Sequence, residues 1–164
     1  MRLSAPDAES FRPFGSFVTP PDAAGARSFY SGYLANPPPG SAPVLHVNHV
    51  PQGRLPLAVT RVERHPQAAQ CFVPLDVSRY AVLVMPSDAD GQPVPDGARA
   101  YLVPGSTGVI YAPGVWHMGA TVLDRAGHFT VLMWRGGAEP DDEFRDIPPL
   151  SLTGPTVTIR KFAR

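Results

Sequence analysis

Residues 57–65 read Leu57-Ala58-Val59-Thr60-Arg61-Val62-Glu63-Arg64-His65. Side chains of an extended strand point alternately to opposite faces. The run therefore predicts a strand in which one face carries Val59, Arg61, Glu63 and His65 and the other carries Ala58, Thr60, Val62 and Arg64. The stretch indicates a β fold and places three ionisable side chains next to one another.

Short apolar runs flank this stretch along the rest of the chain. They cover residues 44–50, 71–74, 80–85, 98–103, 109–111 and 129–135. The 164 residues include 21 Pro and 15 Gly, more than a helical protein tolerates, because proline removes a helical hydrogen bond and clashes with the preceding turn. Short runs punctuated in this way are typical of all-β proteins. We predict one domain over residues 1–164 that forms a closed β-barrel or jelly roll.

The two ends of the chain show weaker patterns. Asp7 as N-cap, with Phe11 and Phe14 three residues apart, predicts a short helical turn that Gly15 ends. Residues 27–34 are predicted as a short strand. The chain after Gly137 is acidic and rich in proline. It is predicted as a tail over residues 138–164 that wraps the surface before a last strand near Thr156–Ile159.

Charge and composition narrow the classes of partner. Basic and acidic residues both number 14, so the formal net charge is zero, and no basic run with interleaved aromatic residues indicates nucleic-acid binding. The apolar runs are far shorter than the roughly 20 residues that cross a bilayer. The N-terminus lacks the apolar core of a secretory signal, and Cys71 is the only cysteine. We expect a cytoplasmic protein with a small-molecule ligand and with neither a nucleic-acid nor a membrane partner.

Two segments, residues 63–74 and 108–117, carry the side chains best suited to chemistry. Glu63 and His65 share a strand face, and Gln70, five residues after His65, returns to the same side on the next strand after a turn. The two segments resemble the two motifs of the cupin superfamily, and the resemblance places His117 as a further imidazole of the site. Imidazole nitrogens and carboxylate oxygens suit several divalent first-row metals. The candidate metal ligands are therefore His65, Gln70, His117 and Glu63, with the neutral Gln70 amide the poorest of them.

Six segments together resemble the ureidoglycolate lyase family, over about residues 10–150. They are Leu55-Pro56-Leu57, Glu63-Arg64-His65-Pro66, Gln70-x-Phe72-x-Pro74, Gly108-Val109-x-Tyr111, Val115-Trp116-His117 and Arg135-Gly136-Gly137. The resemblance implies a cupin-like β-barrel and a homodimer. It also implies an enzyme that cleaves ureidoglycolate to glyoxylate and urea in purine (allantoin) breakdown.

Two segments depart from the family pattern. The usual Trp-His-His-Pro-Leu stands here as Trp116-His117-Met118-Gly119-Ala120, and Trp134 takes the place of an Asp before Arg-Gly-Gly. Both departures lie in or beside the expected site. They leave open that the substrate is a close relative of ureidoglycolate.

The reaction needs a base, an acid and an anchor for the substrate carboxylate. An imidazole titrates near neutrality, so His117 suits either proton-transfer role, with Glu63 as its partner and His65 beside them. Arg61 is the candidate carboxylate anchor, because a guanidinium binds a carboxylate through two hydrogen bonds. Further candidates for substrate contact are Gln70, Arg135 and Tyr111.

Each assignment has a purely structural alternative. Glu63 and Arg61 also suit an ordinary ion pair, and Gln70 a buried amide that satisfies backbone groups. Arg135 suits a strand end before a tight turn, and Tyr111 suits a core position with its hydroxyl satisfied. Two other functions also stay open: a metal-dependent cupin dioxygenase or isomerase, and a non-catalytic module that binds small acids.

Overall fold

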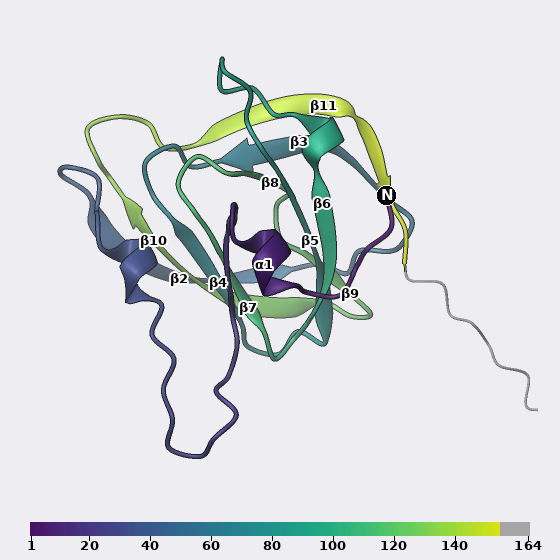
Figure 1. The fold of residues 1–164 in the computed structure, drawn as a ribbon, viewed down its shortest axis with the longest axis horizontal. Helices are drawn as coiled ribbons and strands as arrows, with labels where there is room; N and C mark the ends of the chain where they lie inside the picture. The colour runs from purple at the N-terminus through teal and green to yellow at the C-terminus, as the bar shows by residue number, and fades with distance from the viewer. Residues whose placement is uncertain (155–164) are drawn as a thin grey trace, which may run out of the picture.

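A computed structural model describes residues 1–154, which form two antiparallel sheets and little helix (Figure 1). The first sheet has the strand order β1 (Gly15–Val18), β7 (Gly108–Tyr111), β4 (Gln70–Pro74), β10 (Gly127–Arg135), β2 (Ala42–Val50). The second has the order β11 (Glu143–Leu152), β3 (Leu57–Arg64), β8 (Trp116–His117), β5 (Arg79–Met85), β6 (Arg99–Pro104), and β9 (Thr121–Leu123) also pairs with β5. The predicted all-β fold with a short N-terminal helical turn is confirmed.

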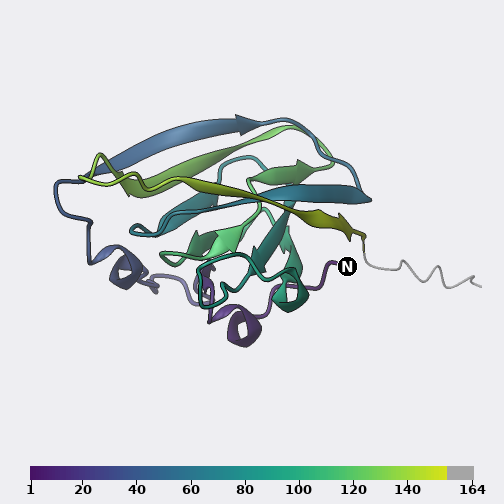
Figure 2. The ribbon, with the colours of Figure 1, turned by 90° about the horizontal axis from the view of Figure 1, so that it is seen from above.

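The main core lies between the two sheets and is rich in aromatic side chains. Phe72 and Phe129 from the first sheet meet Tyr80 and Tyr101 from the second. The helical turn α1 (Ala8–Phe11) lies in front of the strands in Figure 1 and on the lower side in Figure 2. It inserts the fully buried Phe11 into this core. The main core is therefore formed by apolar residues of both sheets and of α1.

A second buried cluster lies on the other face of β5. Ala81, Leu83 and Met85 belong to it, whereas Tyr80, Val82 and Val84 belong to the main core. The N-terminal segment helps to cover this cluster: Leu3 is buried in it, and isolated bridges join Arg2 to Thr153 and Ser4 to Tyr101. This segment thus connects the far end of β11 with β6. Because both faces of β5 are covered, its sequence is continuously apolar instead of alternating.

The C-terminal part of the chain differs from its prediction. Residues 143–152 form the ten-residue strand β11 beside β3, where a surface tail was predicted. The two consecutive prolines Pro148 and Pro149 argue against a strand in the sequence, because proline cannot donate a ladder hydrogen bond. They lie at an irregularity where the pairing register shifts between Asp146 and Leu150, on an outer strand where missing N–H donors are tolerated. The strand predicted near Thr156–Ile159 lies outside the described residues.

Two N-terminal predictions are also wrong. Residues 27–34 do not form a strand: Ser31–Leu34 is the 3-10 turn η1, and Tyr33 N–H donates to the Tyr30 carbonyl within it. Gly15 does not end the helical turn but opens β1. Its φ is 141°, and an added Cβ would lie 1.9 Å from the carbonyl oxygen of Ile110, so the close approach of β1 to β7 requires glycine here.

The alternation predicted over residues 57–65 is interrupted within β3. Val59 and Val62 are both buried in the second cluster, although strict alternation puts them on opposite faces. The irregularity of β11 lies opposite Thr60, between the paired positions Val59 and Arg61. The interruption of the alternation therefore coincides with a local disruption of the β3–β11 ladder.

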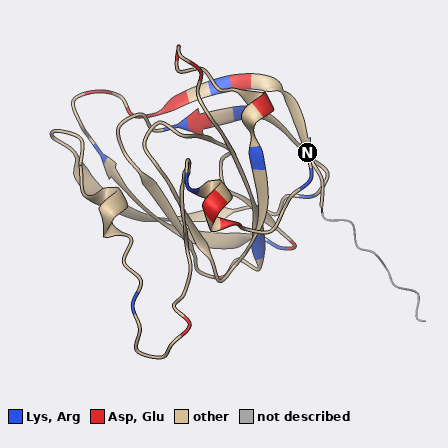
Figure 3. Cartoon of the chain, viewed as in Figure 1, with Lys and Arg blue, Asp and Glu red and all other residues tan. Residues whose placement is uncertain are grey.

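The charged residues are unevenly distributed between the sheets (Figure 3). The five strands of the first sheet contain a single charged residue, Arg135 at the end of β10. The neighbouring strands β3 and β11 of the second sheet contain six. Within the described residues, no helix is long and apolar enough to cross a membrane.

Candidate active site

Four predicted site residues converge where the two sheets meet. Glu63, near the end of β3, lies opposite His117 of β8 in the second sheet. His65 follows the end of β3, and Gln70 begins β4 of the first sheet after the turn of residues 66–69. One short turn therefore carries the chain from one sheet to the other, and it places both His65 and Gln70 beside His117.

His117 is the centre of this cluster and is only 1% exposed. Its Nδ1 lies 2.9 Å from the carbonyl oxygen of Val115, and its Nε2 lies 3.1 Å from Oε1 of Gln70 and 3.5 Å from Oε1 of Glu63. The ring of Tyr111 stacks on the imidazole, with ring centroids 4.0 Å apart. Oxygen acceptors thus surround both ring nitrogens, and the ring is held in place on its flat face.

Glu63 is the partly exposed member of the cluster, with 22% of its side chain accessible. Burial raises the pKa of this carboxyl group, but the hydrogen bond and the charge of His117 outweigh burial, so the pKa lies below its ordinary value. Glu63 is therefore a carboxylate at neutral pH. It is thus both negatively charged, as a carboxyl group that acts as a general base must be, and accessible from solvent.

His65 is buried, and one of its nitrogens has no hydrogen-bond partner. Nδ1 lies 2.7 Å from the carbonyl oxygen of Asp141 and 3.1 Å from Oδ1 of Asp142, whereas Nε2 is buried and unpartnered. Burial lowers the pKa of His65 below its ordinary value, against the hydrogen bond to Asp141, which raises it. The ring is therefore neutral near pH 7, with a proton on Nδ1 and a free lone pair on Nε2.

These side chains fit a divalent metal ion. Glu63, His65 and His117 each offer a ligand atom, and these atoms lie within 4.8 Å of one another. A buried, unpartnered imidazole nitrogen is costly unless something binds to it. Both imidazoles also direct Nδ1 toward a backbone carbonyl, which is the usual support of a metal-bound histidine. Gln70 lies beside this set through His117, as the sequence placed it.

A surface pocket opens beside Glu63. It is lined by Arg61, Val62, Glu63, Gly119 and Phe144. The guanidinium of Arg61 lies over the Phe144 ring, 4.8 Å from its centroid. An added Cβ on Gly119 would meet nothing closer than Oε1 of Glu63, at 3.9 Å. The pocket therefore places the Arg61 cation beside the Glu63 carboxylate.

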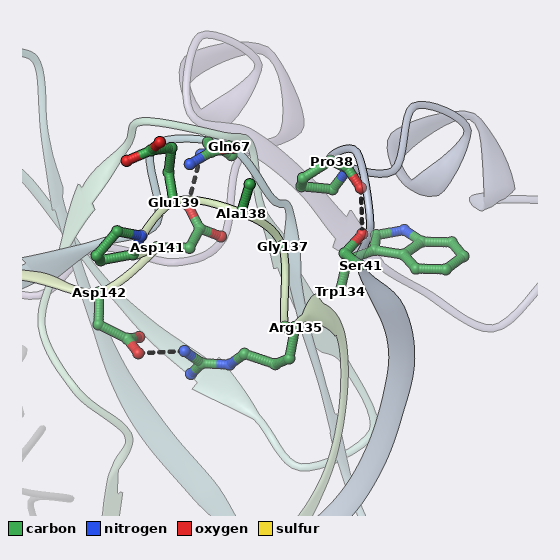
Figure 4. A pocket seen from close by; sticks show the side chains of 12 residues that line it. Pro38, Ser41, Gln67, Trp134, Arg135, Gly137, Ala138, Glu139, Asp141 and Asp142 are labelled. Carbon is green, nitrogen blue, oxygen red and sulfur yellow. Dashed lines mark hydrogen bonds and ion pairs between the residues drawn. The ribbon is translucent and has the colours of Figure 1, made fainter.

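Arg135 lines a second cleft, which is formed largely by residues 134–142 (Figure 4). Its Nη1 contacts Oδ2 of Asp142, the same carboxylate that lies beside His65. Trp134 also lines this cleft and donates from its indole N–H to the Leu34 carbonyl, 3.1 Å away. Arg135 is therefore connected to the site through Asp142, whereas Tyr111 is buried beneath His117.

The departures at residues 118–120 can now be placed. The side chain of Met118 packs into the second buried cluster, which does not include His117. A residue at this position therefore points away from Glu63 and His65. Gly119 instead widens the pocket beside Glu63.

The sequence did not indicate three features of the site. These are the Asp141 carbonyl, the Asp142 carboxylate and the Phe144 ring, which come from the segment predicted as a surface tail. The acidic run Asp141-Asp142-Glu143, soon after Arg135-Gly136-Gly137, was the available signal. Only the position of β11 beside β3 brings that run to His65.

Comparison with known proteins gives one family. The family model described as ureidoglycolate lyase matches residues 3–148. A ureidoglycolate lyase of Burkholderia cepacia is 43% identical over 103 residues, which cover 62% of this chain and 56% of the relative. A putative ureidoglycolate lyase of Agrobacterium fabrum is 31% identical over 136 residues, which cover 82% of each chain.

Several relatives match over only part of their length. A ureidoglycolate lyase of Pseudomonas aeruginosa is 36% identical over 89 residues, which cover 54% of this chain and 52% of the relative. This chain thus spans little more than half the length of the Burkholderia and Pseudomonas relatives. Among solved structures, RmlC from Streptococcus suis in complex with dTDP-D-xylose is similar with a TM-score of 0.43 and 12% identity, over 80% of this chain and 55% of that one.

Proposed function

The chain belongs to the ureidoglycolate lyase family, and from this premise we propose that it cleaves the carbon–nitrogen bond of ureidoglycolate, or of a close ureido acid, to give glyoxylate and urea. The observation that carries the proposal is the convergence of Glu63, His65 and His117 around a buried, unpartnered imidazole nitrogen.

The reaction moves one proton and breaks one bond. The substrate carries a hydroxyl group and a ureido nitrogen on the same carbon, next to a carboxylate. When a base removes the hydroxyl proton, the oxygen forms a carbonyl with that carbon, and the electron pair of the carbon–nitrogen bond leaves with the nitrogen. An acid then protonates the nitrogen to release urea. No oxidant or reductant is needed.

Glu63 is our proposed base and His117 our proposed acid. Glu63 is ionised at neutral pH and borders the pocket through which a substrate enters. The Nε2 of His117 lies 3.5 Å from the Glu63 carboxylate, so a proton taken by one group can be returned through the other. Gln70 and Tyr111 hold the His117 ring in the orientation that this transfer requires.

Arg61 is our proposed anchor for the substrate carboxylate. It lines the same pocket as Glu63, and its guanidinium is exposed over the Phe144 ring. A guanidinium in this position can hold a carboxylate by two hydrogen bonds while the adjacent carbon faces Glu63.

As the alternative to this acid–base pair, we propose a divalent metal ion held by Glu63, His65 and His117 with Gln70 beside them, because an imidazole nitrogen or carboxylate oxygen bound to a metal no longer transfers a proton. A bound ion would lower the pKa of the substrate hydroxyl group and stabilise the oxygen as it loses its proton. His65 supplies a neutral nitrogen for this purpose, fixed by the hydrogen bond from Nδ1 to Asp141.

The direct test is the release of urea and glyoxylate from ureidoglycolate by the purified protein, measured without added metal and with a series of divalent ions. We expect equal amounts of both products. Absence of both products with every ion would refute the assignment. Binding of glyoxylate in a thermal-shift assay without turnover would instead support a module that only binds small acids.

We further propose a cytoplasmic homodimer that forms through the outer face of the first sheet. This sheet has one charged residue, and its outer face exposes Leu45 and Val47 of β2 and Val73 of β4. Among the described strands β2 pairs only with β10, so its other edge offers free backbone groups to a second copy. A twofold axis brings the same patch of both copies together.

Light scattering after size exclusion tests the dimer. We expect the double variant Leu45→Glu, Val47→Glu to be monomeric and the wild type dimeric. The control is Arg99→Glu, which changes an exposed side chain of β6 in the second sheet and is expected to stay dimeric. A monomeric wild type would contradict the proposal.

A further inference from the structure

The segment that joins β10 to β11, residues 136–142, lines the cleft beside Arg135 (Figure 4), and we call it the strap. It is attached to the turn of residues 66–69, where Gln67 N–H donates to Oδ1 of Asp141 at 2.6 Å. It is attached to His65 through the Asp141 carbonyl oxygen, 2.7 Å from Nδ1. The strap is therefore bound to the residues that hold the candidate metal ligand.

Asp142, the last residue of the strap, lies between two cationic or proton-donating groups. Its Oδ1 is 3.1 Å from Nδ1 of His65, and its Oδ2 contacts Nη1 of Arg135. One carboxylate is thus shared by the imidazole and the guanidinium. Arg135 has few competing partners, since its other contact is the weak one from Nε to Sδ of Met133.

We infer that Asp142 is a positioning residue for His65, and that Arg135 limits its effect by sharing the carboxylate. The inference rests on the proposed role of His65 in the site. A carboxylate behind an imidazole favours the form with the proton on Nδ1, and it makes Nε2 a stronger donor to a cation. Arg135 draws negative charge away from the same carboxylate, so its presence weakens that donation.

The two partners of the carboxylate therefore have opposite effects, which a merely structural contact would not produce. Loss of Asp142 weakens the site toward a cation. Loss of Arg135 leaves Asp142 wholly to His65 and removes a nearby positive charge, so it strengthens the site. If the Asp142–Arg135 pair only fastened the strap, both losses would loosen His65 and weaken the site alike.

Binding of Zn²⁺ alone, measured by isothermal titration calorimetry on the metal-free full chain, tests this inference. We expect Asp142→Asn to weaken the affinity about 10-fold, the usual lower range for loss of a group behind a metal-binding histidine. Arg135→Met is expected to bind as tightly as the wild type or more tightly. In the Asp142→Asn background, Arg135→Met should have a smaller effect than it has alone.

Glu139→Gln is the matched control. Glu139 is another acidic residue of the strap, it lines the same cleft, and it is exposed. Its substitution should leave the affinity within twofold of the wild type. Thermal melting of each variant identifies any loss of folding.

The tautomer of His65 gives a second readout that needs no metal. Nitrogen-15 NMR of the imidazole should show the proton on Nδ1 in the wild type. In Asp142→Asn, Arg135 retains the amide oxygen and the amide N–H group faces Nδ1, so a share of the Nε2–H form should appear.

Two results would overturn the inference. One is an Asp142→Asn variant with unchanged Zn²⁺ affinity and an unchanged His65 tautomer. The other is equal weakening by Asp142→Asn and Arg135→Met. Should the wild type not bind Zn²⁺, the tautomer alone decides. Failure of the lyase proposal is seen separately, as a wild type that releases no urea.

Discussion

The molecule contains two pairs of histidines, each with a carboxylate beside it. His65 and His117 lie with ring centroids 5.6 Å apart, next to Glu63, and both imidazoles are buried. His49 and His128 lie on neighbouring strands of the first sheet, and their stacked rings have centroids 4.5 Å apart. Oδ2 of Asp76 lies 2.9 Å from Nδ1 of His128. The residue types are the same, but the surroundings differ.

The difference lies in burial and in the direction of the ring nitrogens. In the buried pair, each Nδ1 atom is hydrogen-bonded to a backbone carbonyl oxygen, and the Nε2 atom of His65 has no hydrogen-bond partner. In the surface pair, the His128 side chain is 41% exposed, so water can form hydrogen bonds with any ring nitrogen that has no protein partner. Water and salt screen the second pair but not the first. Two histidines and a carboxylate make a candidate site only where the fold excludes water from them.

The largest expected effect is on catalysis at the buried pair. His117→Ala should lower the rate of urea release about 10²- to 10⁴-fold, because a positioned acid or base contributes that much. His128→Ala, the matched change in the surface pair, should leave the rate within twofold. Steady-state assays of both variants make the comparison, and a comparable loss in His128→Ala would show that burial does not separate the two pairs.

A smaller effect is expected from the groups that orient each pair. Gln70→Ala removes the oxygen 3.1 Å from Nε2 of His117, so the imidazole loses one of its constraints and turnover should fall about 10-fold. Asp76→Ala removes the corresponding oxygen from His128 and should not change turnover. Comparison of kcat for the two variants tests this, and an unaffected Gln70→Ala would contradict the orienting role.

The smallest effect concerns acid stability at the surface pair. The hydrogen bonds from His128 lower the pKa of Asp76 below its ordinary value. Because the folded-state pKa is lowered, this stabilisation is present above the ordinary pKa and is lost as the pH falls through the lowered value. In His128→Ala, the pKa of Asp76 should rise, as NMR titration of the carboxyl carbon can show. The shift should shrink in high salt, and a shift insensitive to salt would argue against a screened surface pair.

Local pattern was sufficient to predict much of the fold and part of the site, whereas His117 was placed by the resemblance to a known family. Apolar runs between Pro and Gly gave β3, β5, β6, β7 and β10 within a residue or two. The spacing of Glu63, His65 and Gln70 predicted that they meet, and they do lie around His117. These predictions succeeded because strand alternation and a short turn act over fewer than ten residues.

Long-range pairing decided what local pattern could not. β11 contains two prolines in a row, which indicate a loop until an outer strand position accommodates them. The sequence does not show which pair is buried, since in each pair the two histidines lie more than 50 residues apart along the chain. The Asp141 carbonyl and the Asp142 carboxylate, which support His65, lie at least 76 residues beyond it in the chain.

The sequence by itself determined an all-β chain with a polar cluster at the end of one strand, because alternation and turn chemistry are local properties. Only the tertiary structure decided which histidines are buried, which of their nitrogens lacks a partner and which carboxylate stands behind His65. Burial and hydrogen-bond direction depend on the strands that surround a residue, and those strands come from distant parts of the chain.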